Sequence, residues 1–413
     1  MRARHPAAEP MTLRSARFRA IIGMSLLVMT GFGLIVPALP QFATTFDVGE
    51  AGVGAVITAF AVTRLVGDLF TGRLLGRFGE RSVTAIGVAI VGVSSLAAGA
   101  AQSFTQLVVL RGLGGFGSAM FLAGLTATLV GGVAPEARGR AMGTFQAAFG
   151  LGFLVGPALG GVIVAVSSPN MPLYVYGIVC LACVPLSLRA LGIDRVPASV
   201  LSERVELEET VAPPPSATLR GSARLLRHSA FRAAIATGTL TFVVVSAEQT
   251  LIPGMWTDRL GASEATSGVP FAVTALASLL VVWHAGSLSD RRGRRFALIP
   301  GLGVTAVAVV ALGGATSVAA VVVLMAILGA AGGYLRPGPS AMVADVATDE
   351  TRAMAVAGYR LANDVGSLVG PVLVGTLAEY VSFQSAFLLV AALTVVALAM
   401  AVRAEETAPA LAS

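Results

Sequence analysis

Ionisable side chains inside apolar stretches are the residues of this sequence best suited to chemistry. A charged residue at the centre of a membrane-spanning helix costs about 2.5–3.5 kcal/mol, so such residues commonly mark proton, ion or substrate pathways. The positions that meet this description are Arg64, Asp68, Arg111, Glu248, Arg336, Arg360 and Asp364. We therefore expect a proton or substrate pathway to be built from some of them.

Four of these residues form two pairs with four-residue spacing, Arg64 with Asp68 and Arg360 with Asp364. Residues four apart share a helix face, so each pair either neutralises itself as a structural salt bridge or takes part in proton transfer. At ~1.5 Å per residue, Asp364 lies about 16 Å into its stretch, near the bilayer midplane. Asp364, with Arg360 beside it, is therefore the predicted proton carrier. Asp68 lies nearer the end of its stretch, which favours a structural role.

Polar and aromatic residues at similar depth predict an amphipathic, largely apolar pocket. Glu248, about 9 Å from the outer end of its stretch, either attracts cationic substrates or faces outside water, and Gln249 adjoins it. Arg336 precedes Pro337 and Pro339, which predicts a broken helix whose free carbonyls line a cavity. The remaining candidate cavity residues, each of which taken alone is more often a packing residue, are Phe32, Phe145, Gln146, Phe149, Tyr334, Tyr359 and Asn363.

The residue types that several other kinds of chemistry need are scarce. All 28 basic residues are Arg, so a phosphate-binding loop with its Lys is excluded. The three His residues lie far apart in the sequence, and Cys180 and Cys183 sit in an apolar run without a His or acidic neighbour. We therefore expect no metal, no cofactor, no catalytic residue and no nucleic-acid partner, and we expect an ion gradient to supply the energy.

The composition indicates a polytopic membrane protein. Of the 413 residues, 55% are hydrophobic and 12% are charged, and the mean hydropathy is +0.83; soluble domains carry about 25% charged residues. A spanning helix needs about 20 apolar residues. Stretches of that kind lie at 19–41, 51–73, 82–102, 105–133, 141–166, 172–191, 231–254, 266–287, 296–315, 317–343, 353–378 and 384–402. We predict an all-α integral membrane protein with twelve transmembrane helices.

The placement of Arg residues predicts the orientation in the membrane. Most of them lie at the N-terminus, in alternate loops and in the C-terminal tail, and outside the stretches only Arg259 lies in the opposite set of loops. Because cytoplasmic loops are enriched in basic residues, both termini are expected in the cytoplasm. The predicted units are an N-terminal tail (1–18), a six-helix bundle (19–191), a cytoplasmic linker (192–230), a second six-helix bundle (231–402) and a C-terminal tail (403–413).

The two halves repeat each other. Residues 72–81 match residues 286–295 at an offset of 214, and Gly156-Pro157 matches Gly370-Pro371 at the same offset. Two matches at one offset, each at an equivalent span boundary or within an equivalent span, predict two bundles of similar design.

Two repeated six-span halves joined by a cytoplasmic linker resemble the major facilitator superfamily. The loop 286–295 contains the family pattern Gly-x-x-x-Asp-Arg/Lys-x-Gly-Arg/Lys-Arg/Lys in full. In the loop 72–81, Gly76 replaces the Asp and Glu80 replaces a basic residue. The resemblance covers essentially the whole chain.

Two further motifs lie within spans. Arg111, followed by Gly115 and Gly117, resembles a motif of proton-coupled members, which implies a part in proton coupling for Arg111. A pattern in span 5 resembles the drug:proton antiporter branch. Glycines three and four residues apart also let a neighbouring helix approach closely, and a proline permits a bend, so packing alone is the alternative explanation. The residues of this pattern are Gly143, Gly152, Gly156, Pro157, Gly160 and Gly161.

The resemblance implies that the two loops form a conformational latch on the cytoplasmic face. In the second half, Asp290 and the loop Arg residues can join Asp345 in a charge cluster, whereas Gly76 and Val133 occupy the equivalent acidic positions of the first half. We expect the second half to carry most of the latch, although basic loops are also required by topology alone. The residues assigned to it are Gly72, Arg77, Gly79, Arg81, Gly286, Asp290, Arg291, Gly293, Arg294 and Asp345.

These observations predict a secondary transporter of the plasma (inner) membrane that exports small amphipathic compounds or drugs by proton-coupled alternating access, as a monomer. Only the glycine pattern in the fifth stretch (141–166) indicates the direction of transport, so proton-coupled uptake of a small organic solute is the alternative. The first stretch contains no ionisable residue between Ala20 and Phe46, which argues against strong cation selectivity. A non-transporting membrane sensor or scaffold is the alternative of another class, but it has no reason to bear the cost of paired mid-membrane charges.

Overall fold

The computed structural model describes residues 11–134, 137–191, 224–348 and 351–407, all organised around helices. Most of the predicted linker (192–223) and the ends of both tails (1–10 and 408–413) lie outside the described residues. The helices of the first half are α1 (Ala16–Thr44), α2 (Glu50–Gly99), α3 (Phe104–Gly132), α4 (Arg138–Val166) and α5 (Met171–Ala190). Those of the second half are α8 (Ser229–Gly254), α9 (Val269–Arg292), α10 (Arg294–Gly313), α11 (Val318–Leu335), α12 (Pro337–Val346), α13 (Arg352–Tyr380) and α14 (Phe383–Arg403), with a short π-helix η2 (Met255–Arg259) and a 3-10 turn η3 (Glu264–Thr266) after α8.

Ten helical segments of the described chain are long and apolar enough to cross a membrane. One of them, α2, has 50 residues, about 75 Å at 1.5 Å per residue, whereas the hydrocarbon core of a bilayer is about 30 Å thick. It therefore contains two of the predicted spans. The apolar part of α9, Val269–Val282, is shorter than the other spans, and α11 with α12 forms one interrupted span. This arrangement accommodates the twelve predicted stretches, and the all-α membrane fold is confirmed.

The break inside α2 lies at a glycine that the sequence repeat pairs with one in the second half. Gly79 has φ 77° and ψ 163°, and Gly293, between α9 and α10, has φ 108° and ψ 154°. Only glycine adopts this region of backbone space readily. The loop expected at 72–81 is thus helical except at Gly79, and both halves turn the chain at equivalent positions.

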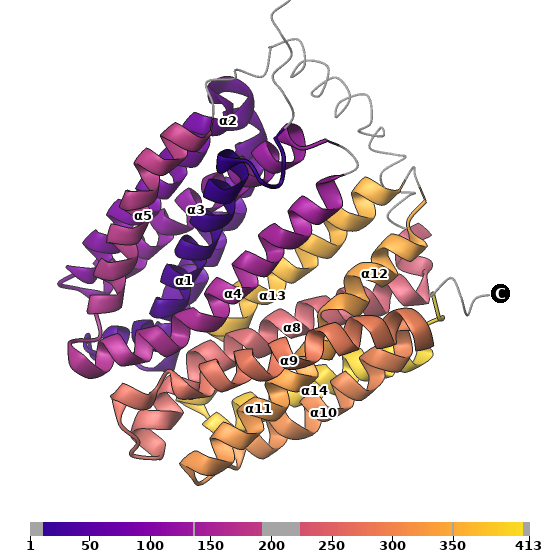
Figure 1. Cartoon of the computed structure of the whole chain (residues 1–413). Coiled ribbons are helices and arrows are strands. Elements are labelled where there is room, and N and C mark those ends of the chain that lie inside the picture. The colour runs from indigo at the N-terminus through magenta and orange to yellow at the C-terminus, as the bar shows by residue number, and fades with distance from the viewer. Residues whose placement is uncertain (1–10, 135–136, 192–223, 349–350, 408–413) are drawn as a thin grey trace, which may run out of the picture.

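Two bundles make up the molecule (Figure 1): α1 to α5 form one and α8 to α14 the other. Each bundle has an apolar core, which includes Ile21, Val88 and Leu125 in the first half and Leu240, Leu302 and Phe387 in the second. We call the end where α5 ends and α8 begins the linker side. The end where α1 and α13 end is the far side.

Within the first bundle, α4 packs closely on α1 through glycine. A Cβ atom added to Gly156 would lie 2.6 Å from Cα of Gly33, and one added to Gly33 would lie 2.8 Å from Cα of Gly156. Real Cβ atoms do not approach so closely, so both positions require glycine. Gly152 and Gly160 also face the backbone of α1, whereas a Cβ at Gly143 or Gly150 would meet nothing within 4 Å.

Polar contacts join the two bundles on the far side. Gln41 Nε2 donates to Ser267 Oγ at 2.7 Å, with both side chains buried. The backbone N–H of Ala51 donates to Glu379 Oε2 at 2.9 Å. Because Gly49 has no side chain to cap α2, Glu379 supplies that cap from the other bundle. The described residues therefore hold the bundles together at their far ends.

The turn at Gly79 should tolerate only glycine. Changing Gly79 to Ala is expected to cost about 1–3 kcal/mol, because an L-residue is strained in this conformation, while the space around the new methyl group is empty. Thermal unfolding of the detergent-purified protein measures the loss. Gly72→Ala, in the helical part of the same motif and also in open space, is the matched control; equal melting points for the two variants would contradict the strain argument.

The α1–α4 contact gives a second expectation. Gly156→Ala should lower the melting temperature, since overpacking commonly costs about 1–3 kcal/mol, and it should also impair transport in vesicles. Gly150→Ala on the same helix adds its methyl group to open space and should behave like the wild type. A Gly156→Ala protein as stable as the Gly150→Ala protein would show that α1 and α4 do not need this close approach.

Candidate functional site

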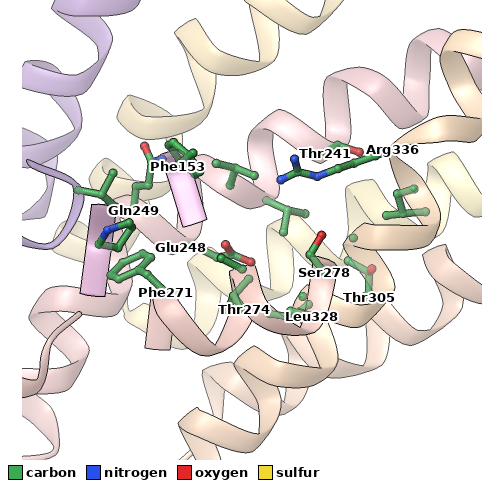
Figure 2. Close-up of a pocket in the computed structure, with 18 residues that line it drawn as sticks. Phe153, Thr241, Glu248, Gln249, Phe271, Thr274, Ser278, Thr305, Leu328 and Arg336 are labelled. Carbon is green, nitrogen blue, oxygen red and sulfur yellow. The ribbon is translucent and has the colours of Figure 1, made fainter. Parts of the chain in front are cut away.

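A cavity lies between the two bundles and is lined by residues from six helices. Val36 of α1 and Phe153 and Pro157 of α4 form its wall on the side of the first bundle. The second bundle contributes residues of α8, α9, α10 and α11 together with Arg336. Figure 2 shows Phe153 and Phe271 at one end of this cavity and Thr305 and Leu328 toward the other. The lining is largely apolar, as expected of a site for amphipathic compounds.

Glu248 of α8 is a charged residue of this lining. Its side chain is only 8% exposed, and it forms no hydrogen bond or ion pair with the residues that the structure describes. Arg336 is the group of opposite charge that acts on it. Of the two alternatives that the sequence left for Glu248, the structure places it in the interior cavity.

Arg336 enters the same cavity from the junction of α11 and α12. The helix is interrupted there, although Arg336 itself keeps helical angles of φ −75° and ψ −49°. Pro337 and Pro339 lack the backbone N–H groups that would bond the carbonyls of Gly333 and Leu335. The interruption therefore follows from missing donors rather than from a sharp turn of the chain.

A second, smaller cavity holds Arg111. Its residues include Phe32, Phe60 and Arg111, and it shares Val36 and Gln249 with the first cavity. Arg111 is 4% exposed, its guanidinium carbon lies 4.7 Å from the centre of the Phe60 ring, and its Nε has no hydrogen-bond partner among the described residues. The face of an aromatic ring is a favourable place for a buried cation. The two cavities thus meet at Val36 and Gln249.

Aromatic rings surround Phe32 at this meeting point. Its ring centre lies 5.5 Å from that of Phe60, 6.3 Å from that of Phe153 and 6.5 Å from that of Tyr176. The sequence predicts Phe32 as a cavity residue but not Phe60 or Phe153. Those two residues come from α2 and α4, and no sequence signal distinguishes them from other aromatic residues in apolar helices.

The two intramembrane Arg–Asp pairs lie together. They lie where α2 contacts α13: Arg64 and Asp68 belong to α2, and Arg360 and Asp364 belong to α13. Asp364 interacts electrostatically with each of the other three. We call these four residues the seam cluster. Within the described chain no ion pair joins any two of them, and none of them lines either cavity. The structure therefore separates Asp364 and Arg360 from Arg111, the third residue predicted for proton coupling.

Several predicted cavity residues lie elsewhere in the described chain. Phe145 is 3% exposed in the core of the first bundle and its ring centre lies 6.4 Å from that of Phe149, while Gln146 is exposed. The ring centre of Tyr334 lies 6.4 Å from that of His284, edge to face. Tyr359 and Asn363 pack against Gly238 of α8. None of these residues belongs to the linings of the two cavities.

The linker-side loop of the second half is held by carboxylates. Arg294 Nε lies 3.2 Å from Asp345 Oδ2. Glu406, just beyond α14, accepts hydrogen bonds from the backbone N–H groups of Arg294 at 2.8 Å and Arg295 at 3.1 Å, and so caps α10. The side chain of Asp290 lies outside the described residues. The cap by Glu406 was not anticipated, because nothing in the sequence connects the C-terminal tail to this loop.

The equivalent loop of the first half, residues 72–81, is not held by carboxylates in this way. Arg73, Arg77 and Arg81 have no carboxylate at ion-pair distance among the residues of the described chain; instead, Arg77 lies over the ring of Phe78 at 5.4 Å. The remaining residues of the predicted latch, Gly72, Gly79, Gly286, Arg291 and Gly293, lie in or beside the two equivalent turns.

Two helical bundles with interior cavities and charged groups between them define a multi-pass membrane transporter. The sequence profile of the Major Facilitator Superfamily matches residues 21–283 and 239–412, which span both halves. The chain belongs to this superfamily, whose members are transporters of small molecules rather than enzymes.

Characterised relatives include bacterial resistance proteins. The chain is 29% identical over 165 residues to Multidrug resistance protein 1 of Bacillus subtilis, covering 40% of this chain and 42% of that protein. It is 29% identical over 152 residues to the Quinolone resistance protein NorA of Staphylococcus aureus, covering 37% of this chain and 39% of that protein. The aligned region thus spans about two fifths of each relative.

Solved structures share the whole fold. A bacterial homolog of the human lysosomal transporter Spinster, in an inward-facing and unoccupied conformation, superposes with a TM-score of 0.74 at 14% identity, over 96% of this chain and 97% of that chain. A point mutant of the nucleoside transporter NupG superposes with a TM-score of 0.75 at 14% identity, over 94% of this chain and 99% of that chain. At such identities the likeness concerns the fold.

The cap on α10 can be tested directly. Glu406→Ala removes the acceptor for two backbone N–H groups, and losing an N-cap costs about 0.5–2 kcal/mol. Hydrogen–deuterium exchange should therefore become faster in a peptide that contains Arg294 and Arg295. Glu405→Ala, which removes a neighbouring exposed carboxylate, is the control. Equal exchange in the two variants would mean that the tail does not stabilise this loop.

Proposed function

We propose that this protein is a proton-driven exporter of small amphipathic compounds, drugs among them, that works by alternating access in the plasma (inner) membrane. The observation that carries the proposal is the apolar cavity between two bundles that are joined by polar contacts at their far ends. A site between two halves that are tied at one end suits a transporter that exposes its cavity to each side in turn.

The orientation follows from the distribution of Arg residues. The linker side carries Arg14, Arg17 and the basic turns, and basic residues favour the cytoplasm. Both termini are then cytoplasmic and the far side faces outward, so the closed far side makes this conformation an inward-facing one. In the transport cycle, residues 19–191 and 231–402 act as the two rocking units, linked by 192–230 and flanked by the tails 1–18 and 403–413, within a single monomer.

Asp364 is the proposed proton carrier. It lies at the seam between the bundles, where the positive charges of Arg64 and Arg360 and the negative charge of Asp68 all act on it. Rocking of the bundles changes the separation of α2 and α13, and with it these electrostatic interactions. Protonation of Asp364 therefore favours one state over the other. Arg111, buried beside Phe60 in the second cavity, is proposed to link ligand binding to this event.

The second-half loop is the proposed latch. Asp345 and Arg294 already form an ion pair in this conformation, and Asp290, Arg291 and the glycine turn complete the set. Export rather than uptake is favoured by the names of the relatives, which are resistance proteins, and by the glycine pattern of α4.

Everted membrane vesicles test coupling and direction together. With an acidic interior, a panel of fluorescent dyes and antibiotics should accumulate inside, and addition of substrate should release protons to the medium. Movement of substrate in the opposite direction would establish uptake as the physiological process and overturn the proposal.

Asp364→Asn tests the proton role. The variant should lose concentrative transport, because an amide does not ionise, while downhill exchange of substrate persists. Glu264→Gln, which changes an exposed carboxylate of η3, is the matched control and should transport normally. Concentrative transport at the wild-type level in Asp364→Asn would move the proton site to another residue.

A further inference from the structure

The main cavity holds two opposite charges that do not meet. Glu248 enters from α8, and Arg336 enters from the junction of α11 and α12 (Figure 2). Each acts electrostatically on the other, but neither forms an ion pair or a hydrogen bond with any residue in the part of the chain that the structure describes. A carboxylate, which only accepts hydrogen bonds, and a guanidinium, which only donates them, thus face the same space without a partner in the described chain.

The other polar groups of the lining do not satisfy these charges. The hydroxyl of Thr241 donates to the carbonyl of Thr237 at 2.8 Å, and that of Thr305 donates to the carbonyl of Gly301 at 2.8 Å. The hydroxyl of Thr274 lies within hydrogen-bonding distance of the carbonyls of Pro270 and Met325. The protons of these three hydroxyls are therefore committed to backbone carbonyls. The hydroxyl of Ser278, also in the lining, forms no hydrogen bond with Glu248 or Arg336.

The buried charge of Glu248 sets a condition on what the cavity binds, whereas the side chain of Arg336 is exposed. Glu248 is more than nine-tenths buried, and removing a charge from water without a partner costs several kcal/mol. A purely cationic ligand would satisfy Glu248 and bring a second positive charge near Arg336. A purely anionic ligand would do the reverse. A ligand with both signs of charge pairs its cationic group with the buried Glu248 and its anionic group with Arg336, and brings no like charge near either residue.

We infer that this cavity is a dipolar binding site that selects small zwitterionic amphipaths, with the cationic group at Glu248, the anionic group at Arg336 and an aromatic or aliphatic body against Phe153 and Phe271. Charge-assisted hydrogen bonds at both ends fix the orientation of the ligand. The aromatic rings at one end of the cavity offer flat apolar surfaces to its body. This inference rests on the proposed transport function and names the substrate class for it.

One fluorescent scaffold in four charge forms tests the inference. Nα-dansyl-lysine is a zwitterion, its methyl ester is a cation, its Nε-acetyl derivative is an anion, and the Nε-acetyl methyl ester is neutral. Binding to the full-length protein in detergent is followed by dansyl fluorescence. The wild type should bind the zwitterion about tenfold or more tightly than each of the other three forms.

Two variants should change the order of affinities in opposite ways. Glu248→Gln should weaken binding of the zwitterion and the cation about tenfold and leave binding of the anion equal or tighter, because a like charge is removed. Arg336→Gln should weaken binding of the zwitterion and the anion and leave binding of the cation equal or tighter. Glu264→Gln and Arg403→Gln remove exposed charges elsewhere and serve as controls. Binding of the neutral form at wild-type affinity shows that each variant is folded.

The outcomes separate this inference from the proposed function. An unchanged order of the four probes in both variants would overturn the dipolar site. So would a Glu248→Gln/Arg336→Gln double variant that binds the zwitterion as tightly as the wild type, since the two residues would then neutralise only each other. The binding assay uses no proton gradient, so its result stands even if export in everted vesicles fails, and the reverse also holds.

Discussion

The hydrocarbon core of a bilayer offers no water, and this constraint governs the whole structure. Every backbone N–H and C=O in the core needs a partner within the protein, which makes the helix the natural unit. The described helices give up regular hydrogen bonding only at defined places. Gly79 and Gly293 turn the chain at its linker-side end, and Arg336 interrupts a span beside an interior cavity.

The same constraint explains how the bundles are built and joined. Apolar side chains gain little by leaving lipid for protein, so helices in a membrane associate through close packing and polar contacts. Gly33 and Gly156 supply the close packing between α1 and α4. Between the bundles, Gln41 bonds to Ser267, Glu379 caps α2, and the hydroxyl of Thr58 donates to the carbonyl of Leu368 at 2.9 Å. Glycine also supplies close packing here, because a Cβ atom added to Gly54 of α2 would collide with the carbonyl of Pro371 of α13.

The intramembrane charges fall into separate groups with separate surroundings. The seam cluster balances two Arg with two Asp residues between α2 and α13. Arg111 rests on the ring of Phe60. Glu248 and Arg336 face a cavity with no partner among the described residues. Asp364 lines neither of the two cavities, so the proposed proton carrier and the cavity residues Glu248 and Arg336 occupy different places in the described chain.

The sequence by itself determined the apolar spans, the repeat and the equivalence of Gly79 and Gly293, because hydropathy, helical periodicity and glycine turns are local properties of the chain. It also identified the charged residues, since any ionisable group in an apolar stretch stands out. Which of them meet was decided only by the tertiary structure. Two pairs that each appeared self-contained, Arg64 with Asp68 and Arg360 with Asp364, lie together, and Glu248 and Arg336 share a cavity that excludes Phe145, Tyr334 and Tyr359. The physical reason is that neighbours across a helix–helix interface depend on the rotation and crossing of whole helices, and in uniformly apolar helices no sequence pattern records which face is turned toward which partner.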